Sequence, residues 1–156
     1  VGELGREDHV DGPVAAGALA QPSGLCLLGR YLLFADAETS SIRALDLQSH
    51  QLLTIVGRGL FDFGDADGKS GQAKLQHPLG VTLLGDEVLV ADTFNHKVRA
   101  IGLTDGTTRT IAGGAGVFAE PGGLARLGDF AVVADTNHHQ LRAVHLETGE
   151  VRTLLA

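Results

Sequence analysis

QHPLGVTLLGDEVLVADTFNHKVRAIGLTDGTTRTIAG, residues 76–113, decides the fold, because the same pattern occurs three times in this chain. It contains Pro78, a glycine two places on, an apolar run that ends at Asp92, a polar turn, a second strand-like run with Arg99, and a short closing run. A unit of about 40 residues that recurs in this way is typical of repeat architectures.

The three copies, anchored on Pro22, Pro78 and Pro121, align without a gap. Four columns of identical residues run through them at fixed distances from the proline. These columns are Gly24, Gly80 and Gly123; Asp36, Asp92 and Asp135; Arg43, Arg99 and Arg142; and Thr54, Thr110 and Thr153. All variation in length therefore lies in the segments between copies.

Each copy is expected to form four short antiparallel strands. In the first copy the apolar runs are 24–28, 31–36, 41–47 and 52–56, separated by turn residues such as Gly29. The second run is apolar on nearly every residue, as expected of a strand that is covered on both faces. No segment shows helical periodicity over the length that a helix needs.

Small sheets with two apolar faces must stack on one another, and radial stacking gives a β-propeller. We therefore predict an all-β chain of three four-stranded blades, near residues 20–57, 76–113 and 119–156, with 1–19 and 58–75 as loops between blades. A β-sandwich is the alternative, but it does not predict three copies that align without gaps. Three blades would be half of a six-bladed ring, which a homodimer would complete.

The composition describes a folded chain that does not bind nucleic acid. Of its 156 residues, 44% are hydrophobic and 20% are charged, and the net charge of −7 disfavours contact with phosphate backbones. No apolar run approaches the roughly 18 residues needed to span a membrane. No secretory signal is visible, so we expect a soluble chain of unknown compartment and favour the cytoplasm.

The chain contains no Met, so either an initiator was removed or, as we favour, the chain is a piece of a longer protein. Val1 and Gly2 are similar to Val56 and Gly57, which end the first copy. The single cysteine, Cys26, lies in a column of small residues, so we expect a structural role for it.

The pattern P-x-G, apolar run, A-D-x-x-x-H-x-[VLI]-R and terminal T-[IL]-x-G resembles the NHL repeat, whose full domains are usually six-bladed propellers. All three copies follow it, although the first has Ser40 in place of His and the third ends on Ala156 in place of Gly. The stretch FGDADGKSGQAKLQHPLGV is similar, more narrowly, to the group of NHL-repeat-containing protein 2, in which the propeller follows a thioredoxin-like domain. The resemblance implies a propeller fold and a redox-associated parent protein.

Each Asp of the repeat ends one strand, and each Arg enters the next strand seven residues later across a polar turn. We interpret these residues as internal ion pairs or turn caps, because identical residues in every blade are typical of a scaffold. The structural residues predicted in this way are Asp36, Arg43, Asp92, Arg99, Asp135 and Arg142.

The polar turns offer candidate binding residues. His96 and His139 occupy one position in adjacent copies, so a metal or substrate site between neighbouring blades would fit there. Polar turn residues with ordinary capping hydrogen bonds are the plainer interpretation, because the first copy has Ser40 at this position.

The loop 58–75 departs most from the repeat, which makes it the favoured place for function. Asp62, Asp65 and Asp67 are oxygen ligands suited to a hard cation, although neither an EF-hand nor a phosphate-loop pattern fits the loop. The alternative is an ordered loop with Phe61 or Phe63 tucked beneath it.

Arg126 stands where the other copies have Leu27 and Leu83, so it would either line a central channel or lie along the surface. The candidate ligand- or partner-binding residues are Asp62, Asp65, Asp67, His77, Asn95, His96, Arg126, His138 and His139. We find no nucleophile, base and acid at interpretable spacing and no Cys/His metal motif, so no catalytic or metal-binding residue is predicted.

We expect a non-catalytic platform that binds a protein or a ligand without a cofactor, and that self-associates because two apolar blade faces would be exposed. One alternative is a metal-dependent propeller enzyme of the lyase or lactonase type, which would use Ca²⁺ or Zn²⁺. Another is an RNA-binding NHL domain, which the charge disfavours. A protein partner is expected, whereas nucleic acid and membrane are not.

Overall fold

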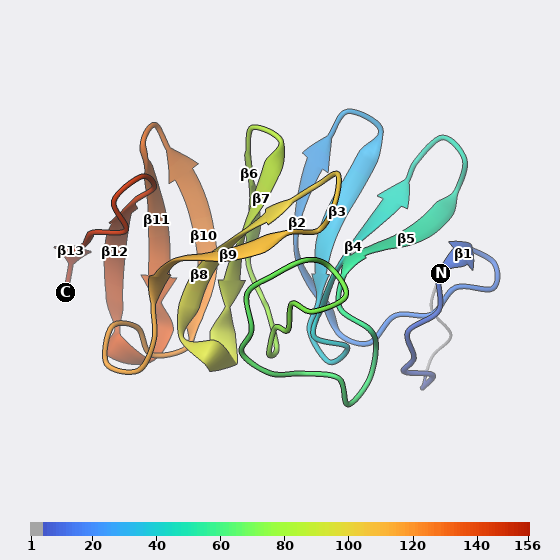
Figure 1. Ribbon diagram of the computed structural model, residues 1–156, viewed down its shortest axis with the longest axis horizontal. Coiled ribbons are helices and arrows are strands. Elements are labelled where there is room, and N and C mark those ends of the chain that lie inside the picture. Colours follow the sequence, from blue (N-terminus) through green and yellow to red (C-terminus); the bar gives the residue numbers. More distant parts are fainter. Residues whose placement is uncertain (1–4) are drawn as a thin grey trace.

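The computed structural model describes residues 5–156 and contains three antiparallel sheets of four strands each, which we call blades 1, 2 and 3; a fifth, two-residue strand joins the edge of blade 1 (Figure 1). The predicted all-β architecture of three such sheets is confirmed. The strands are β1 (Gly12–Pro13), β2 (Pro22–Leu28), β3 (Tyr31–Asp36), β4 (Ser41–Asp46), β5 (Gln51–Val56), β6 (Val81–Leu84), β7 (Glu87–Asp92), β8 (Lys97–Gly102), β9 (Thr108–Gly113), β10 (Pro121–Leu127), β11 (Phe130–Asp135), β12 (Gln140–His145) and β13 (Val151–Leu155).

Within each blade the strands follow chain order, from β2 to β5, from β6 to β9 and from β10 to β13. The third and fourth strands shift register at the same place in every blade, between Val98 and Arg99 in blade 2. Such a bulge redirects side chains, and here it coincides with the repeated Arg.

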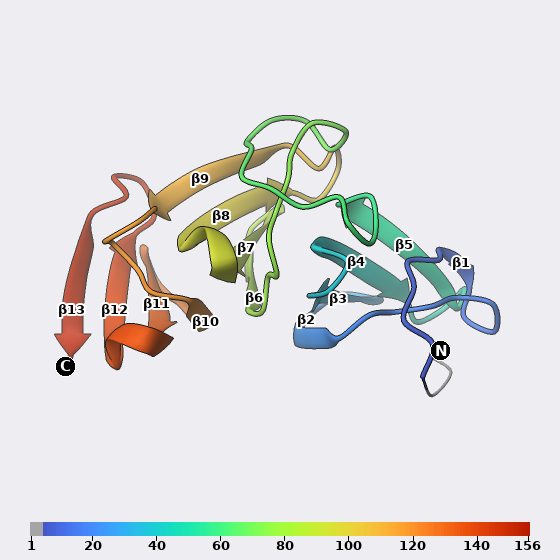
Figure 2. The same cartoon turned by 90° about the horizontal axis from the view of Figure 1, so that it is seen from below.

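The three blades radiate from a common centre and form an open arc (Figure 2). The first strands, β2, β6 and β10, lie side by side along the inside of the arc, and the last strands lie outside. The inner strands approach closely, since the N–H of Gly24 donates to the carbonyl of Leu79 at 2.7 Å. A Cβ on Gly24 would lie 2.5 Å from that oxygen, and one on Gly80 would meet the carbonyl of Gly122 in the same way, which explains the glycine two places after the proline in blades 1 and 2.

Two apolar cores fill the spaces between blades. β7 belongs to both cores, because Val88 and Val90 pack toward blade 1 and Leu89 packs toward blade 3. All three side chains are fully buried, which confirms the prediction of a strand covered on both faces. Leu75 and Phe118, from the segments that precede blades 2 and 3, complete the two cores.

The segment before blade 1 differs from the simple loop that we expect for residues 1–19. Gly12 and Pro13 form the two-residue strand β1, which pairs with the outer strand β5. The pairing follows from Asp11, which accepts hydrogen bonds from Arg43 and Thr54 and so holds this segment against the blade. The similarity of Val1 and Gly2 to the end of a copy lies outside the described residues.

Two single-turn 3₁₀ helices, η1 (Thr93–Asn95) and η2 (Thr136–His138), form the polar turns after β7 and β11. Each ends on a histidine in the left-handed conformation, with φ of 57° at both His96 and His139. Neither of the helices within residues 5–156 has the length and apolarity needed to cross a membrane.

Candidate functional site

The repeated Asp and Arg form a buried scaffold at the end of each blade that carries the polar turns. Nη1 of Arg43 donates to Oδ2 of Asp36 at 2.8 Å, and both side chains are fully buried. The other oxygen of Asp36 accepts the N–H of Ala20, sixteen residues earlier, at 2.8 Å. Each Asp therefore joins the entry of its blade to the third strand.

Blades 2 and 3 repeat this arrangement with looser Arg contacts. Nε of Arg99 lies 2.9 Å from Oδ2 of Asp92, at an angle that makes no hydrogen bond, and the contact is a charge interaction. Nη1 of Arg142 donates to Asp135 at 3.3 Å. Burial raises the pKa of Asp92 to about 6, against the opposing hydrogen bonds from Asn95 and from the N–H of Gln76 and the charge of Arg99.

Asp65 and Asp67 pin the loop 58–75 onto blade 2. Asp67 accepts from Nη1 of Arg99 at 2.6 Å and from the N–H of Thr110 at 2.9 Å. Asp65 pairs with Lys97 at 2.7 Å and also contacts Arg99. Asp11 does the same for Arg43 in blade 1. Asp11 and Asp67 each precede a glycine and lie eleven residues before Pro22 and Pro78, so this Asp-Gly dipeptide anchors the segment before each of these blades.

Asp62 completes the acids of the loop and pairs with Lys74 at 2.7 Å, a hydrogen bond that lowers the pKa of Asp62. All three acids of the loop thus face cationic side chains. Within residues 5–156 there is no group of three His, Cys, Asp or Glu placed to hold a metal ion.

The loop exposes its aromatic side chains, so the expectation that Phe61 or Phe63 is tucked beneath it is wrong. Phe61 is 91% exposed and Phe63 is 53% exposed. The space beneath the loop is filled instead by Ala73 and Leu75, both buried in the core between blades 1 and 2. Phe61, Phe63 and Phe94, the last of which is 46% exposed, form what we call the aromatic rim.

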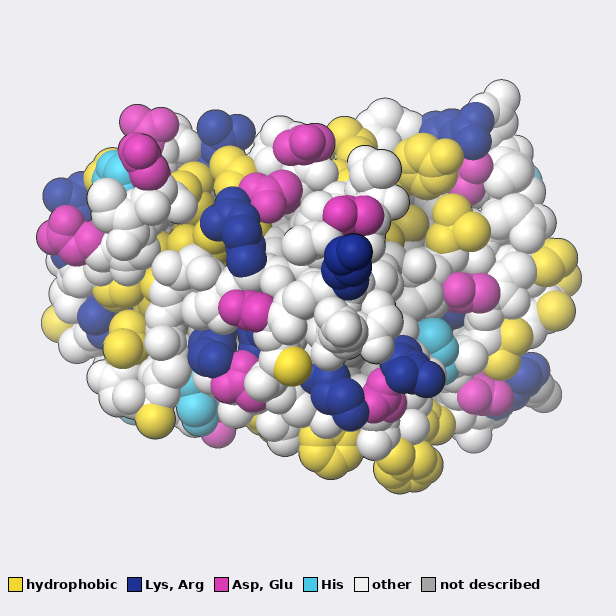
Figure 3. Space-filling model, viewed as in Figure 1, with side chains coloured by type: hydrophobic (Ala, Val, Ile, Leu, Met, Phe, Trp, Pro, Cys, Tyr) yellow, Lys and Arg dark blue, Asp and Glu magenta, His cyan; other side chains and the backbone are white. Residues whose placement is uncertain are grey.

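Asn95 holds the loop and the turn η1 together. Its Nδ2 donates to the carbonyl of Gly64 at 2.7 Å and to Asp92 at 2.8 Å. The His77 ring stacks on Phe94 with centroids 4.6 Å apart. Hydrophobic side chains project from the lower edge of the molecule, where the loop lies (Figure 3).

The other histidines of the turns have separate partners. Nδ1 of His96 accepts the N–H of Glu120 at 3.0 Å, and Nδ1 of His138 lies 2.9 Å from Asp135. His139 is exposed and makes no side-chain hydrogen bond within residues 5–156. Apart from Arg126, the predicted candidates therefore share one end of the blades without converging on a single point.

Arg126 is exposed on the inner strand β10, and its Nε donates to the carbonyl of Gly128 at 3.1 Å. It borders a hollow of about 260 Å³ whose other walls include Leu84, His145 and Glu147. This hollow lies between blades 2 and 3, at the end opposite the polar turns.

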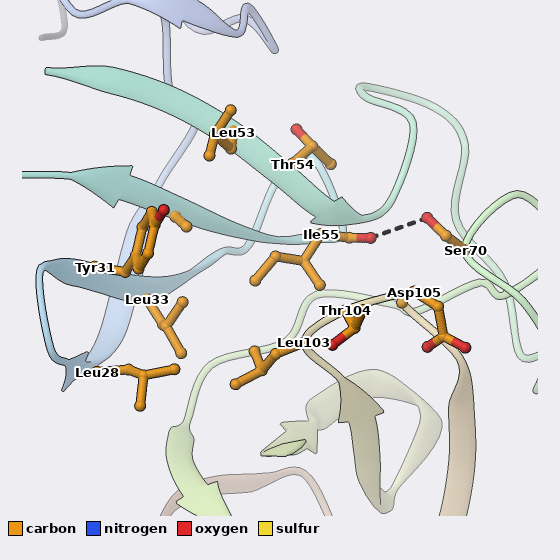
Figure 4. A pocket seen from close by; sticks show the side chains of 12 residues that line it. Leu28, Tyr31, Leu33, Leu53, Thr54, Ile55, Ser70, Leu103, Thr104 and Asp105 are labelled. Atoms are coloured by element: carbon orange, nitrogen blue, oxygen red, sulfur yellow. Dashed lines mark hydrogen bonds between the residues drawn. The ribbon is translucent and has the colours of Figure 1, made fainter. Parts of the chain in front are cut away.

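A larger hollow of about 570 Å³ lies between blades 1 and 2 and escaped the sequence reasoning (Figure 4). Its walls include Tyr31, Leu53 and Leu103, and Ser70 closes one side by donating to the carbonyl of Ile55 at 2.9 Å. A difference between the aligned repeat copies could have indicated this hollow. The second copy has Glu87 and Arg109 in place of Tyr31 and Leu53, and these two residues pair at 2.7 Å.

Comparison with known proteins gives the chain its relatives, although no family model matches it. Human NHL repeat-containing protein 2 is 41% identical over 105 residues, which cover 60% of this chain and 14% of that protein. The resemblance to the NHL-repeat-containing protein 2 group is confirmed. The chloroplastic protein SUPPRESSOR OF QUENCHING 1 of Arabidopsis thaliana is 39% identical over 105 residues, 62% of this chain and 10% of that protein. The chain thus spans a small part of these relatives.

Solved structures support the fold alone, because their identity to this chain is low. A protein of unknown function from Bacteroides thetaiotaomicron matches 97% of this chain with a TM-score of 0.70 at 17% identity, over 35% of its own length. A nidogen/laminin complex contains a chain that matches 85% of this one with a TM-score of 0.67 at 17% identity, over 47% of its length.

Proposed function

We propose that this chain is a protein-binding platform and that the aromatic rim is its contact surface. The observation that carries the proposal is Phe61, a bulky residue with φ of 70° and 91% exposure. A left-handed backbone is unfavourable for a bulky side chain, and exposure returns no burial energy within the chain. Such a conformation is consistent with a side chain presented to a partner.

The rim has the properties of a binding hot spot. Aromatic side chains combine large contact area with few rotatable bonds, and they dominate the energetics of many interfaces. The loop that carries Phe61 and Phe63 is already held by Asp67 on Arg99 and by Asn95 on Gly64. A partner would therefore meet an ordered surface and would not bear the full entropic cost of ordering it.

A binding role fits the polar groups around the rim better than a catalytic role. Asp65, Asp67 and Asn95 are already engaged in the scaffold, where they hold the loop in place. We place this platform in a redox-associated protein, as the resemblance implies. Its own single cysteine, Cys26, is half-buried, and burial raises the pKa of the thiol, so the chain would bind and not exchange disulfides.

Site-specific photo-crosslinking tests the proposal directly. The photoreactive amino acid p-benzoylphenylalanine would replace Phe61 or Phe94 in the protein expressed in its own cells. The matched control position is Leu47, which is 46% exposed in the turn between β4 and β5. We expect the same crosslinked protein from positions 61 and 94, and we expect that this protein is not crosslinked from position 47. Equal labelling at all three positions, or no crosslink at 61 and 94, would contradict the proposal.

A further inference from the structure

The two ends of the arc carry apolar faces that the repeat buries elsewhere. The outer face of blade 1, which we call the leading face, exposes Leu25 by 62%, whereas its equivalent in blade 2, Val81, is 7% exposed against blade 1. An apolar hollow of about 150 Å³ lies on this face, between Leu25, Phe34 and Leu52. The leading face of blade 1 is thus equivalent to the surface of blade 2 that packs against blade 1.

The outer face of blade 3, which we call the trailing face, has the complementary character. Leu141 is 41% exposed, although its equivalents Ile42 and Val98 are fully buried in the two cores. Leu155 is 64% exposed, and its equivalents in blades 1 and 2 are likewise buried. The trailing face is therefore the surface that blades 1 and 2 each press against the next blade.

One hydrogen bond is repeated at both blade junctions. In the described part of the chain, its acceptor is unused at the end of blade 3, and its donor is unused at the start of blade 1. Ser40 accepts the N–H of His77 at 3.2 Å, and His96 accepts the N–H of Glu120 at 3.0 Å. The next acceptor in this series is His139, which is exposed at the end of blade 3. The matching donor is the N–H of Gln21, which has no hydrogen-bond acceptor among residues 5–156.

At two further positions the residue type matches its equivalents at the blade junctions, although residues 5–156 contain no further blade beyond it. Leu19 is only partly buried on the leading face, whereas its equivalents Leu75 and Phe118 fill the two existing cores. A Cβ on Gly123 would meet nothing within 4 Å, whereas a Cβ on Gly80 would collide with the backbone of blade 3. The glycine of this column is thus retained in blade 3, where no neighbour in the chain requires it.

From these contacts we infer that two copies of this chain associate by packing the trailing face of each on the leading face of the other. Propellers contain about four to eight blades, and six is the only multiple of three in that range. A two-fold axis through the centre of the ring makes both new junctions identical and leaves no apolar blade face uncovered. Nδ1 of His139 in each copy accepts the N–H of Gln21 in the other.

The new junction differs from the existing ones at its outer edge. His50 occupies the position of Gly106 and Gly149, where a Cβ would lie 2.6 and 2.5 Å from the backbone of the preceding blade. The outer turn of blade 1 must therefore stand slightly away from blade 3 of the other copy. Replacing His50 by Gly removes this obstruction and should tighten the association.

Sedimentation equilibrium of the 156-residue chain and three variants tests the inference. We expect a mass of twice the 16.2 kDa of one chain. Leu25→Asp and Leu155→Asp should each weaken association by about 100-fold or more, because they place a charge in an apolar junction. Both side chains are exposed in the single chain, so the variants should fold with unchanged circular dichroism. Phe61→Asp, an equally drastic change at an exposed side chain of the loop 58–75 away from both faces, should remain dimeric.

Subtler variants distinguish this ring from another mode of pairing. His139→Ala removes one hydrogen bond from each junction and should weaken association about fivefold per junction. His50→Gly should strengthen it, which a variant that merely disturbed folding would not do. A monodisperse monomer at high concentration, or a dimer that Leu25→Asp and Leu155→Asp leave intact, would overturn the inference.

Closure can be separated from open head-to-tail growth with cysteines. In a Cys26→Ala background, Gln21→Cys with His139→Cys should yield only a two-chain species on a non-reducing gel. A ladder of longer species would show an open chain of copies and would contradict the closed ring. The equivalent pair within one chain, Ser40→Cys with His77→Cys, serves as the positive control for crosslinking at a blade junction.

Discussion

Gly80 and Gly123 occupy the same position in blades 2 and 3 but have different surroundings. A Cβ on Gly80 would strike the carbonyl of Gly122, whereas the same atom on Gly123 would meet open space. At the scale of the residue, the sequence alignment predicts that the column is glycine but not why. The reason is the approach of two inner strands, which depends on the neighbouring blade and is invisible in one copy.

This difference gives a matched pair of substitutions. Gly80→Ala should lower the free energy of unfolding by about 1 to 3 kcal/mol, because backbone must move to accommodate the methyl group. Gly123→Ala should leave the unfolding of a single chain almost unchanged, and should weaken self-association if the junction proposed above forms. Chemical denaturation at low protein concentration measures the first effect, and sedimentation measures the second. Equal destabilisation of unfolding by both variants would contradict the different environments.

Asp92 makes stability depend on pH in a predictable direction. Burial raises its pKa from 3.8 to about 6, so between these values the folded chain keeps a proton that the unfolded chain releases. This contribution to stability is complete below pH 4 and is lost as the pH rises to about 6. The difference in unfolding free energy between the wild type and Asp92→Asn should therefore shrink across this window.

Asp105 provides the control of opposite sign for that pH series. Hydrogen bonds from the N–H and Oγ1 of Thr107, at 2.9 and 2.7 Å, lower the pKa of Asp105. Its stabilising contribution is present above its ordinary pKa and is lost as the pH falls. The difference in unfolding free energy between the wild type and Asp105→Asn should therefore grow as the pH rises to the ordinary pKa of 3.8 and then stay constant, whereas the difference for Asp92→Asn shrinks between pH 3.8 and about 6. The same trend in both variants would refute the assignment.

At the scale of the element, the strands were predictable and the loop 58–75 was only partly so. Strand β7 is recognisable from its unbroken apolar run, since burial on both faces leaves no polar position. The role of Asp67, eleven residues before Pro78, was signalled by Asp11, which lies eleven residues before Pro22. The outward direction of Phe61 and Phe63 was not predictable. It follows from the ion pairs that Asp65 and Asp67 of the same loop make with Lys97 and Arg99 of β8, which are distant in the sequence.

The anchor of this loop can be tested by comparing two of its acids. Asp67→Ala deprives the fully buried Arg99 of a hydrogen-bond acceptor and should cost about 1 to 3 kcal/mol of stability. Asp62→Ala removes an exposed pair with Lys74 and should cost less than about 1 kcal/mol. Hydrogen exchange of residues 58–75 should accelerate strongly in the first variant and little in the second. Similar exchange in both would mean that Arg99 does not hold the loop.

At the scale of the whole molecule, the repeat explains both what the chain completes and what it leaves open. Two junctions between blades are filled by apolar cores, and the arc presents one unfilled half of a junction at each end. Closure by a second copy would place both aromatic rims on the same side of one ring. The two-fold axis coincides with the central axis of the ring, so the rotation that relates the two copies does not turn either copy over. That both rims would bind a partner from this side rests on the proposed function, whereas the inferred association of two copies does not.

The structure of the assembly in solution, determined by electron cryo-microscopy, tests the central claim most directly. The predicted result is a closed ring of six blades from two chains, with His139 of each chain against Gln21 of the other and both aromatic rims exposed on one side. Isolated three-blade arcs, or chains that pair through the rims with His139 and Gln21 in solvent, would contradict it.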